Sequence, residues 1–399
     1  MPTPDPLLAS AMAAHQAGRL KEAARGYERV LRKRPKDPDA LHFCGLLHFH
    51  RGQGVKAVQL IMRSLEHAPA NPHAWNNLGN ILSMQEKVAE AKEAYRRVTA
   101  LAPGMAEAWY NLGICLRDEG SFDAAATHFQ TALERQPNFL RGYETLGRLL
   151  YRLGKFHEAA DVYRRWLQLE PEHPVARHMA AATSGTHAPA RADDKYVSDL
   201  FDRFAPGFDH NLRGLGYRAP ELVSAALGEY VAVANSLDVL DAGCGTGLCG
   251  PLLRPFCRRL VGVDLSKNMI DLARQRGYEE LVVEELCAFM RSRPGEFDAV
   301  VSADTLVYFG ALEEACAAAK RTLRGAGWFI FTVEALLDAG DEPHKLQVHG
   351  RYTHREAYVR KVLGDGGFTI LQVRRETLRM ERLQEVAGYL VIARVDAAR

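Results

Sequence analysis

The amino-acid sequence predicts two domains of different class, an all-α repeat solenoid followed by an α/β domain with a mainly parallel sheet. Three observations lead to this prediction. The first half repeats with a period of 34 residues, the second half alternates short apolar runs with amphipathic stretches, and a glycine-rich turn follows the first of those runs. A chain of 399 residues also exceeds what one compact core usually fills, so two domains are expected.

The composition excludes several classes of function. Hydrophobic residues make up 47% of the chain and the formal net charge is +2, which gives no electrostatic reason to expect a nucleic acid or an anionic membrane as partner. The seven cysteines are scattered and never spaced as CxxC, so we expect no disulfide framework, no metal site and a reducing, cytoplasmic location. No signal peptide and no run of about 18 apolar residues is visible, so neither secretion nor membrane insertion is expected.

In the first half, a proline closes each repeat, with glycine, alanine and a bulky residue at fixed offsets from it. The prolines follow one another at steps of 34 residues, at Pro35, Pro69, Pro103, Pro137 and Pro171. Small residues let the two helices of a hairpin approach each other, and proline ends the second helix. This pattern resembles the tetratricopeptide repeat, which implies about five two-helix units over residues 4–173, enough to bury a stacked core.

Asn77 and Asn111 occupy the same position in two successive repeats. In tetratricopeptide proteins an asparagine there often faces the groove and binds a peptide, so the resemblance implies a protein or peptide partner, or self-association, through the repeats. The alternative is a solvated asparagine on a helix surface, because Phe43 and Thr145 interrupt the column.

The end of the repeats is expected in PEHPVARHMAAAT, which follows Pro171 and reads as a capping helix. The next stretch, SGTHAPARADD, contains glycine, proline and charge without periodicity, and is typical of a linker. The domain boundary is therefore predicted near Thr186, with a repeat domain at 1–186 and an α/β domain at 187–399.

The second half reads as strands and helices in alternation, which predicts a parallel sheet covered on both faces. Expected strands are LDVLDA (237–242), RLVGVD (259–264), LVV (281–283), FDAVVSA (297–303) and WFIFTV (328–333). Helices are expected up to Phe256, up to Arg276 and around 312–323. The tail segments FTILQVRR (368–375) and GYLVIARV (388–395) are expected as a β-hairpin at the edge of the sheet.

The chemistry concentrates in VLDAGCGTGLCG (239–250). Gly243, Gly245 and Gly247 permit a tight turn in which the backbone approaches a ligand, and Asp264 ends the next strand, where it can accept hydrogen bonds from ribose hydroxyls. Residues 245–250 also satisfy the dinucleotide pattern GxGxxG, which is weak evidence by itself. Asp241 suits the sulfonium and ammonium groups of S-adenosylmethionine but would repel a pyrophosphate, so this cofactor is favoured over a dinucleotide.

The run Asp-x-Gly-x-Gly-x-Gly resembles motif I of class I methyltransferases, and VGVDLS (261–266) resembles their ribose-binding motif. The segments LFDRFAPGFD (200–209), DTLVYFGALEEA (304–315) and HGRYTH (349–354) extend this resemblance to nearly the whole chain. The chain is similar to a bacterial family of predicted S-adenosylmethionine-dependent methyltransferases fused to tetratricopeptide repeats. This implies an enzyme with a Rossmann-like class I methyltransferase domain and a seven-stranded sheet, but it does not identify the methyl acceptor.

The cofactor is expected to contact residues at the strand ends and on the segment before the first strand. These are Asp241, Gly243, Gly245, Gly247, Asp264, Leu265, Met269, Glu285, Leu286, Ala303, Asp304 and Phe208. Glu285, with Glu284 nearly equal to it, is the candidate for the adenine amino group, although either acid could instead cap a helix. Asp304 could contact the methionine moiety, orient the acceptor or cap the next segment.

The acceptor is expected to lie between a lid helix and the HGRYTH segment. Phe204 and Phe208 would cover the sulfonium by cation–π attraction, or else pack in the core. Arg351 could bind an acceptor carboxylate, and His349 or His354 could act as general base, unless all three are surface residues without a catalytic task. Further residues expected at this mouth are Tyr308, Tyr352 and Glu334.

No Asp/Asn-Pro-Pro-Tyr follows the fourth strand, where the sequence reads SADT. This argues against methylation of amides or exocyclic amines and favours an oxygen or carboxylate acceptor on a small or carrier-bound molecule. Two alternatives stay open at this point. One is a protein or peptide substrate held in the repeat groove, and the other is a non-enzymatic scaffold with a cofactor-sensing site.

Overall fold

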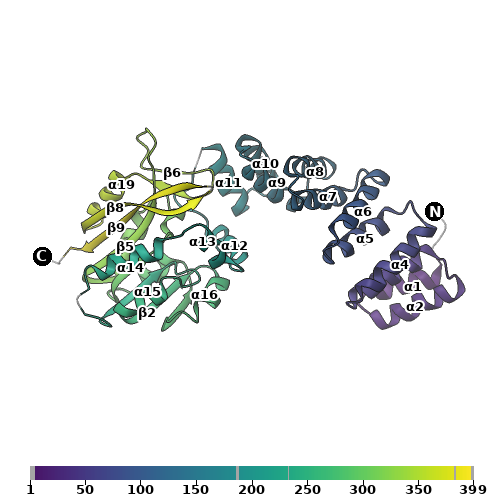
Figure 1. The fold of residues 1–399 in the computed structure, drawn as a ribbon, viewed down its shortest axis with the longest axis horizontal. Helices are drawn as coiled ribbons and strands as arrows, with labels where there is room; N and C mark the ends of the chain where they lie inside the picture. The colour runs from purple at the N-terminus through teal and green to yellow at the C-terminus, as the bar shows by residue number, and fades with distance from the viewer. Residues whose placement is uncertain (1–4, 186–187, 232, 382, 397–399) are drawn as a thin grey trace. The chain divides into compact units, whose positions relative to one another are not determined.

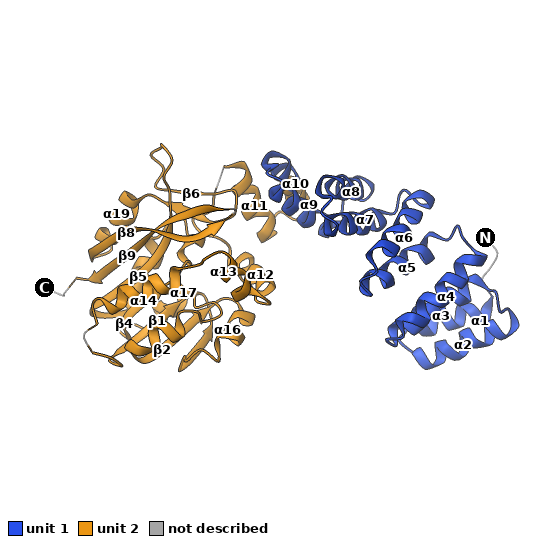
Figure 2. Ribbon diagram, in the orientation of Figure 1, with its two compact units in different colours: residues 1–162 blue, residues 163–399 orange. Residues whose placement is uncertain are grey.

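The computed structural model describes residues 5–185, 188–231, 233–381 and 383–396. The chain forms two compact units, Met1–Val162 and Tyr163–Arg399 (Figure 2). The predicted boundary near Thr186 falls on residues 186–187, which lie outside the described residues. Among the described residues, no helix has both the length and the apolar character needed to cross a membrane.

The first unit is a succession of antiparallel helix pairs (Figure 1). Its helices are α1 (Pro6–Gln16), α2 (Leu20–Lys33), α3 (Pro38–His50), α4 (Gly54–His67), α5 (Pro72–Met84), α6 (Val88–Leu101), α7 (Ala106–Asp118), α8 (Phe122–Arg135), α9 (Leu140–Arg152) and α10 (Phe156–Leu169), the last of which runs on past the end of the unit. Each repeat proline comes two residues after the end of a second helix, as predicted. Asp37 and Asn71 begin α3 and α5 by accepting a backbone N–H at the helix start.

The glycine and aromatic columns of the repeats meet inside one hairpin. A Cβ built on Gly79 would lie 2.6 Å from Cε1 of Tyr95, and one on Gly113 would lie 2.7 Å from Cε1 of Phe129. The missing side chain therefore lets the aromatic ring of the second helix lie directly on the first helix. This explains why both columns keep the same 34-residue period.

The second unit contains the sheet and the helices around it (Figure 1). The strands are β1 (Leu237–Ala242), β2 (Cys257–Asp264), β3 (Glu280–Val283), β4 (Phe297–Ser302), β5 (Leu323–Ala335), β6 (His344–Leu346), β7 (Tyr352–His354), β8 (Phe368–Glu381) and β9 (Gln384–Val395). The helices are α11 (Pro174–Ser184), α12 (Asp194–Phe204), α13 (Phe208–Gly214), α14 (Ala219–Gly228), α15 (Gly250–Leu253), α16 (Lys267–Ala273), α17 (Leu286–Ser292), α18 (Glu313–Thr322) and α19 (Glu356–Asp365). Two short 3-10 helices are η1 (Arg254–Phe256) and η2 (Leu306–Tyr308).

Seven strands have the predicted arrangement, in the order β3-β2-β1-β4-β5-β9-β8, with β9 antiparallel to both of its neighbours. The α/β prediction is confirmed, but the sheet has nine strands within the described residues. The two further strands are β6 and β7. Strand β7 pairs with Glu334 and Ala335 of β5, beyond Phe331, where the pairing between β4 and β5 ends. The β6–β7 hairpin therefore lies past the carboxyl end of β4.

Both faces of the sheet are covered, as parallel strands require. On one face, α17, α18 and α19 pack on strand residues such as Val261, Val300 and Phe329. On the other face, α14 and α15 pack on residues such as Val239, Val301 and Ile330. The carboxyl ends of β1, β2 and β4 remain for a ligand.

Helix α11, expected to cap the repeats, belongs to the second unit. Its Ala181 and Ala182 pack with Leu346 and Tyr352 of the β6–β7 hairpin. The buried ring of His178 donates from Nε2 to the carbonyl of Gly350 at 2.8 Å. This helix is therefore a support for the hairpin beside the carboxyl end of β4.

Candidate functional site

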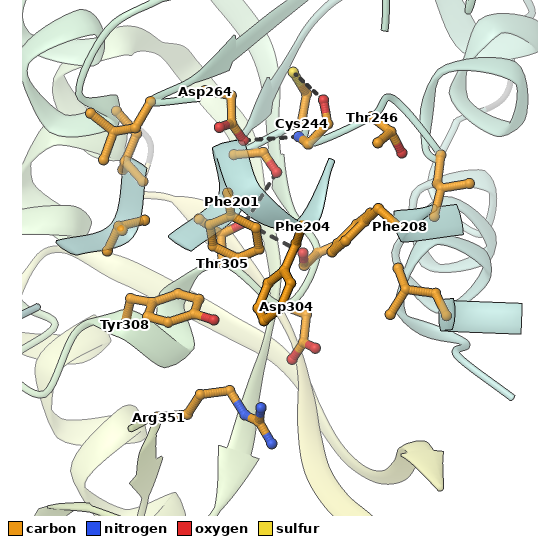
Figure 3. A pocket seen from close by; sticks show the side chains of 18 of the residues that line it. Phe201, Phe204, Phe208, Cys244, Thr246, Asp264, Asp304, Thr305, Tyr308 and Arg351 are labelled. Carbon is orange, nitrogen blue, oxygen red and sulfur yellow. Dashed lines mark hydrogen bonds between the residues drawn. The ribbon is translucent and has the colours of Figure 1, made fainter. Parts of the chain in front are cut away.

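A cavity of about 330 Å³ lies at the carboxyl ends of the central strands (Figure 3). Its volume is typical of small-molecule sites, and its position is the usual one for ligands of open α/β sheets. Twelve of the residues proposed from the sequence lie in its wall, namely Phe204, Phe208, Gly243, Gly245, Asp264, Leu265, Glu285, Leu286, Ala303, Asp304, Tyr308 and Arg351.

The turn after β1 brings backbone to the cavity through residues in the left-handed region. Gly243 has φ of +81°, and a Cβ there would lie 2.2 Å from Oγ1 of Thr305. Gly245 has φ of +54°, and a Cβ there would meet no atom within 4 Å. Gly243 therefore lets the turn pack closely against Thr305, whereas Gly245 keeps the space beside the turn open for a ligand.

Asp264 ends β2 with its carboxylate fixed by backbone. Its Oδ2 accepts the N–H of Gly245 at 2.9 Å, and its Oδ1 accepts the N–H of Ser266 at 2.8 Å. Burial raises the pKa of Asp264, and these backbone N–H groups oppose that rise. Each oxygen keeps a lone pair for a hydroxyl of the ligand.

Asp241 lies behind the turn, fully buried and outside the cavity wall. Its Oδ2 accepts the hydroxyl of Tyr278 at 2.6 Å, while its Oδ1 has no hydrogen-bond partner among the described residues. Burial raises the pKa of Asp241 to about 7. A buried carboxylate oxygen without a partner is costly, so this residue fits a site completed by a cationic ligand.

Glu285 caps a helix and also lies where it could contact the cofactor, the two alternatives predicted for it. It lines the cavity, and it also caps α17, because its Oε2 accepts the N–H of Ala288 at 2.7 Å. Its Oε1 accepts Nη1 of Arg191 at 3.2 Å, a contact that the sequence did not suggest. Contact with an adenine amino group therefore stays a prediction, with Glu284 also in the cavity wall.

The expected lid is two helices, α12 and α13, rather than one. Acidic side chains hold it to the sheet. Asp209 accepts the hydroxyl of Thr246 at 2.6 Å, and Asp202 accepts that of Ser266 at 2.5 Å. Phe204 is 43% exposed, so it is not a core residue. The lid thus presents aromatic rings to the cavity while it is bonded to both ligand-binding turns.

Five charged side chains, which we name the ion cluster, meet at the far side of the cavity from Asp264. They are Asp304, Glu334, Arg351, Arg379 and Glu381. The buried Arg379 binds Asp304 at 2.6 Å and Glu381 at 2.7 Å, and it also contacts Glu334. Arg351 binds Glu334 and Glu381, each at 2.6 Å.

The role predicted for Arg351 is changed by these bonds. Its Nε and Nη2 already donate to protein carboxylates, which leaves Nη1 without a protein partner among the described residues. A contact through Nε would break a bond of the ion cluster. The N–H groups left for an acceptor oxygen are the two on Nη1 and the second one on Nη2.

Asp304 has an unusual backbone for a residue that is not glycine. Its φ is +58°, and its N–H donates to Oγ1 of Thr332 at 2.8 Å. One carboxylate oxygen, Oδ2, accepts Arg379, and the other, Oδ1, has no partner among the described residues. Strained residues held in this way are concentrated at functional sites.

The two histidines proposed as general base do not reach the cavity wall. His354 is fully buried and donates from Nε2 to the carbonyl of Phe309 at 2.8 Å. His349 accepts the N–H of Arg351 on Nδ1 at 3.3 Å. Burial lowers the pKa of each ring to about 4. Both rings hold the HGRYTH segment in place, and so does Tyr352, whose hydroxyl donates to the carbonyl of Pro189 at 2.6 Å.

Four other proposed residues lie away from the cavity wall. Gly247 and Met269 pack behind it, and Met269 is fully buried in α16. In the first unit, Nδ2 of Asn77 contacts Nε2 of His42 at 2.9 Å, and Nδ2 of Asn111 donates to Oδ1 of Asn80 at 3.1 Å. Each asparagine therefore uses one of its two amide N–H groups within the repeats.

Several cavity residues were not proposed from the sequence, among them Arg191, Phe201, Tyr217, Thr305, Arg379 and Glu381. Thr305 adjoins Asp304 and could have been found by its position after β4. Arg379 lies four residues past the strand expected at 368–375, so no strand pattern pointed to it. Its partner Asp304 lies 75 residues away in the sequence, so no local pattern indicated that the two side chains pair.

Comparison with known proteins agrees with the geometry. A family model described as a methyltransferase domain matches residues 240–331, and tetratricopeptide-repeat models match 14–81, 76–139 and 116–174. Magnesium-protoporphyrin O-methyltransferase of Synechocystis is 30% identical over 165 residues, which are 38% of this chain and 71% of that protein. The chain belongs to the S-adenosylmethionine-dependent methyltransferases. This methyltransferase uses S-adenosylmethionine as its cofactor.

Two further relatives cover less of their own length. An uncharacterized methyltransferase of Schizosaccharomyces pombe is 29% identical over 34% of this chain, and the match spans about half, 49%, of that protein. The ubiquinone biosynthesis O-methyltransferase of Thiobacillus denitrificans is 32% identical over 24% of this chain and 43% of its own length. These matches cover only parts of the chain and of the relatives.

Two solved structures are also similar. Magnesium protoporphyrin IX methyltransferase from Synechocystis with bound S-adenosylhomocysteine aligns with a TM-score of 0.40, at 20% identity over 51% of this chain and all of that chain. MamA aligns with a TM-score of 0.38, at 23% identity over 41% of this chain and 95% of that chain.

The residues of the cavity fit S-adenosylmethionine. Asp264 would receive its ribose hydroxyls, and the negative charge of Asp241, buried behind the turn, would favour its ammonium group. The bound cofactor supplies a methyl group on a positive sulfonium. Gly245 leaves room beside the turn, and the aromatic rings of Phe204 and Phe208 suit a positive charge and exclude water.

Proposed function

We propose that this methyltransferase acts on an oxygen, a hydroxyl or a carboxylate, of a small or carrier-bound molecule. The observation that carries this proposal is the pair of polar atoms in the acceptor side of the cavity, Nη1 of Arg351 and Oδ1 of Asp304. Neither has a protein partner among the described residues, and the wall around them is mostly aromatic and aliphatic. An N–H donor and a carboxylate are what an acceptor oxygen and its proton require.

Two further facts support an oxygen acceptor. The residues after β4 are Ala303, Asp304 and Thr305, so no Pro-Pro-Tyr is present to hold an amide or a planar amine. Two of the relatives above are named as O-methyltransferases. Methyl transfer is an in-line displacement, so the protein needs mainly to align the acceptor and exclude water, which the bonded lid helices favour.

The repeats are proposed to bind a protein or peptide partner, or a second copy of the chain. Tetratricopeptide repeats present extended surfaces for such partners. A second candidate function, methylation of a peptide held by the repeats, rests on Asn77 and Asn111. Because one N–H of each amide is engaged by His42 or Asn80, a bound peptide would be left the carbonyl oxygen and the second N–H of each asparagine.

The test is transfer of labelled methyl groups. The enzyme and methyl-labelled S-adenosylmethionine are incubated with lysate from a strain that lacks the protein, and labelled small molecules are separated from labelled protein. We expect label in small or carrier-bound molecules, as an alkali-labile ester or an alkali-stable ether. Label in N-methyl groups would contradict the oxygen acceptor. Label in protein that is lost in Asn77→Ala with Asn111→Ala would favour the peptide substrate instead.

A further inference from the structure

We propose that the acceptor is an uncharged aromatic hydroxyl and that Asp304 is the general base that takes its proton, on Oδ1. This inference rests on the proposed oxygen acceptor and narrows it to one class. It assigns a catalytic residue that the sequence considered only for cofactor binding, substrate orientation or capping.

The carboxylate of Asp304 is held so that one oxygen is used and the other is free. Its backbone is fixed in the left-handed region by the bond from its N–H to Thr332, and its Oδ2 is fixed by Nη1 of Arg379 at 2.6 Å. Oδ1 is buried and accepts no hydrogen bond among the described residues. Figure 3 shows the carboxylate on the side of the cavity where Arg351 enters. A base needs an oxygen that no protein donor occupies, and Asp304, a residue of the cavity wall, has one.

The charge of the ion cluster favours an uncharged acceptor. Two guanidinium groups face three carboxylates, and each carboxylate is bonded to at least one of them. An acceptor carboxylate would add a fourth negative charge, while the cluster has only two guanidinium groups, both already bonded to its own carboxylates. A hydroxyl adds no charge, so it avoids this repulsion.

The wall of the cavity favours an aromatic acceptor. Phe201 makes edge-to-face contacts with Phe208, at 6.0 Å between ring centres, and with Tyr308, at 5.5 Å. Tyr217 and Phe204 also line the cavity. Such rings bind a planar ring by stacked or edge-to-face contacts, and they leave polar atoms only at the ion cluster.

Other candidate bases are less suited. In Glu334 and Glu381, Oε1 accepts from both Arg351 and Arg379. Burial raises the pKa of each carboxyl, but the two guanidinium groups outweigh it and hold the pKa below its usual value, which makes both weaker bases. The tyrosines Tyr217 and Tyr308 line the cavity, but burial raises the pKa of each hydroxyl, so both remain protonated at neutral pH and can only donate. Within the ion cluster, Asp304 is the carboxylate that has a buried oxygen without a partner among the described residues.

The step balances with no further reactant. The hydroxyl proton moves to Oδ1 of Asp304, and an electron pair of the acceptor oxygen forms the bond to the methyl carbon. The bond between that carbon and sulfur breaks, and its electron pair stays on sulfur. The products are an aryl methyl ether and S-adenosylhomocysteine, and Asp304 later gives the proton to water.

The pH dependence follows from the groups that face Asp304. These are Arg379 and Glu381 of β8, Glu334 of β5, Arg351 before β7, Tyr217 before α14 and Tyr308 of η2. Burial raises the pKa of Asp304, against the opposing effect of Arg379. Because a base must be ionised, the rate with an un-ionised phenol should fall as pH drops through this raised pKa.

The test uses three ring compounds with the full chain at pH 8. They are 4-methoxyphenol, which is un-ionised, 4-nitrophenol, which is mostly ionised, and 4-methoxybenzoate, a carboxylate. Asp304→Asn should lower kcat/KM for 4-methoxyphenol by about 10²–10⁴-fold and lower it far less for 4-nitrophenol, which needs no base. Affinity for S-adenosylmethionine, measured by calorimetry, reports whether the variant keeps its fold and cofactor site.

Two comparison variants sharpen the result. Glu381→Gln disturbs the ion cluster without removing the base, so it should lower the rates with both phenols by a similar factor. Asp365→Asn, an exposed acid outside the cavity wall, should leave both rates unchanged. With 4-methoxyphenol, the fall in rate as pH is lowered should be present in the wild type and absent in Asp304→Asn.

The outcomes separate this inference from the proposed function. Equal losses with the two phenols in Asp304→Asn would overturn the general base. Methylation of 4-methoxybenzoate in preference to both phenols, or no turnover of either phenol, would overturn the aromatic hydroxyl and leave the oxygen acceptor standing. Labelled N-methyl products in the lysate would overturn the proposed function itself.

Discussion

Asp241→Asn replaces a buried carboxylate with a neutral group of the same shape. Burial raises the pKa of Asp241 from 3.8 to about 7, so the folded protein holds a proton that the unfolded chain releases between these values. Stability should therefore fall as pH rises through this window, because the unfolded state binds fewer protons there. Each tenfold change in proton affinity corresponds to about 1.4 kcal/mol, which makes the full cost of ionising Asp241 roughly 4 kcal/mol.

The assay is denaturant unfolding of the cofactor-free protein, followed for the transition of the second unit at pH 5 and pH 8. From pH 5 to pH 8, the free energy of unfolding of the variant should rise by roughly 3 kcal/mol relative to that of the wild type. Of the roughly three pH units between the unfolded and folded pKa values of Asp241, about two lie above pH 5, and each corresponds to about 1.4 kcal/mol. Asp304 also titrates, but it is present in both proteins and cancels. Asp264 is present in both as well, and its repulsion of Asp241 is part of the raised pKa that the substitution removes. A difference between variant and wild type that is the same at both pH values would refute the reasoning.

The same substitution tests whether the charge of Asp241 favours binding of the cofactor's ammonium group. At pH 6 the wild-type carboxyl is mostly protonated, so binding of S-adenosylmethionine should release close to one proton. Calorimetry in buffers with different heats of ionisation counts that proton. Asp241→Asn should bind more weakly and release none, and an equal proton count in both proteins would show that the ammonium group binds elsewhere.

The remaining predictions concern packing around the site. Gly243→Ala should destabilise the protein by about 2–4 kcal/mol in denaturant unfolding, because its Cβ would lie 2.2 Å from Oγ1 of Thr305 in a left-handed backbone. Gly245→Ala, the matched control, meets no atom within 4 Å and should cost only about 1–2 kcal/mol while weakening cofactor binding in calorimetry. Equal stability losses would contradict this distinction. His178→Ala should raise KM for the acceptor more than it weakens cofactor binding, because the ring holds the carbonyl of Gly350 at 2.8 Å, next to Arg351. A weaker affinity for the cofactor with an unchanged KM would refute that coupling.

The fold was predictable where side chains repeat or alternate over many residues. The 34-residue columns predicted the helix pairs, and apolar runs predicted seven strands. Strands β6 and β7 have three residues each, too few for a period to show. The break between α12 and α13 at Pro206 was also missed, although proline is a known helix breaker.

Prediction of the site was better on the cofactor side than on the acceptor side. Gly243, Gly245 and Asp264 follow directly from the strands that carry them, so sequence spacing alone brings them to one edge of the sheet. The acceptor side depends on pairings between distant segments, such as Asp304 with Arg379. His354 was predicted as a base because histidine titrates near neutral pH. In the structure its ring is buried and bonded to the carbonyl of Phe309, so it stabilises the fold instead.

The segment predicted as a linker contributes to the cavity wall, and this changes what the domain boundary means. The carbonyl of Ala190 accepts the N–H groups of Gly310 and Ala311, each at 2.8 Å, and the N–H of Ala192 donates to the carbonyl of Tyr308 at 2.8 Å. Arg191, between them, reaches Glu285. Glycine, proline and charge without periodicity predicted a linker, and nothing in the local sequence indicates the backbone hydrogen bonds that this segment makes. The partners lie more than a hundred residues further on, after β4, so the chain that leaves α11 is bonded across the catalytic site before the sheet begins.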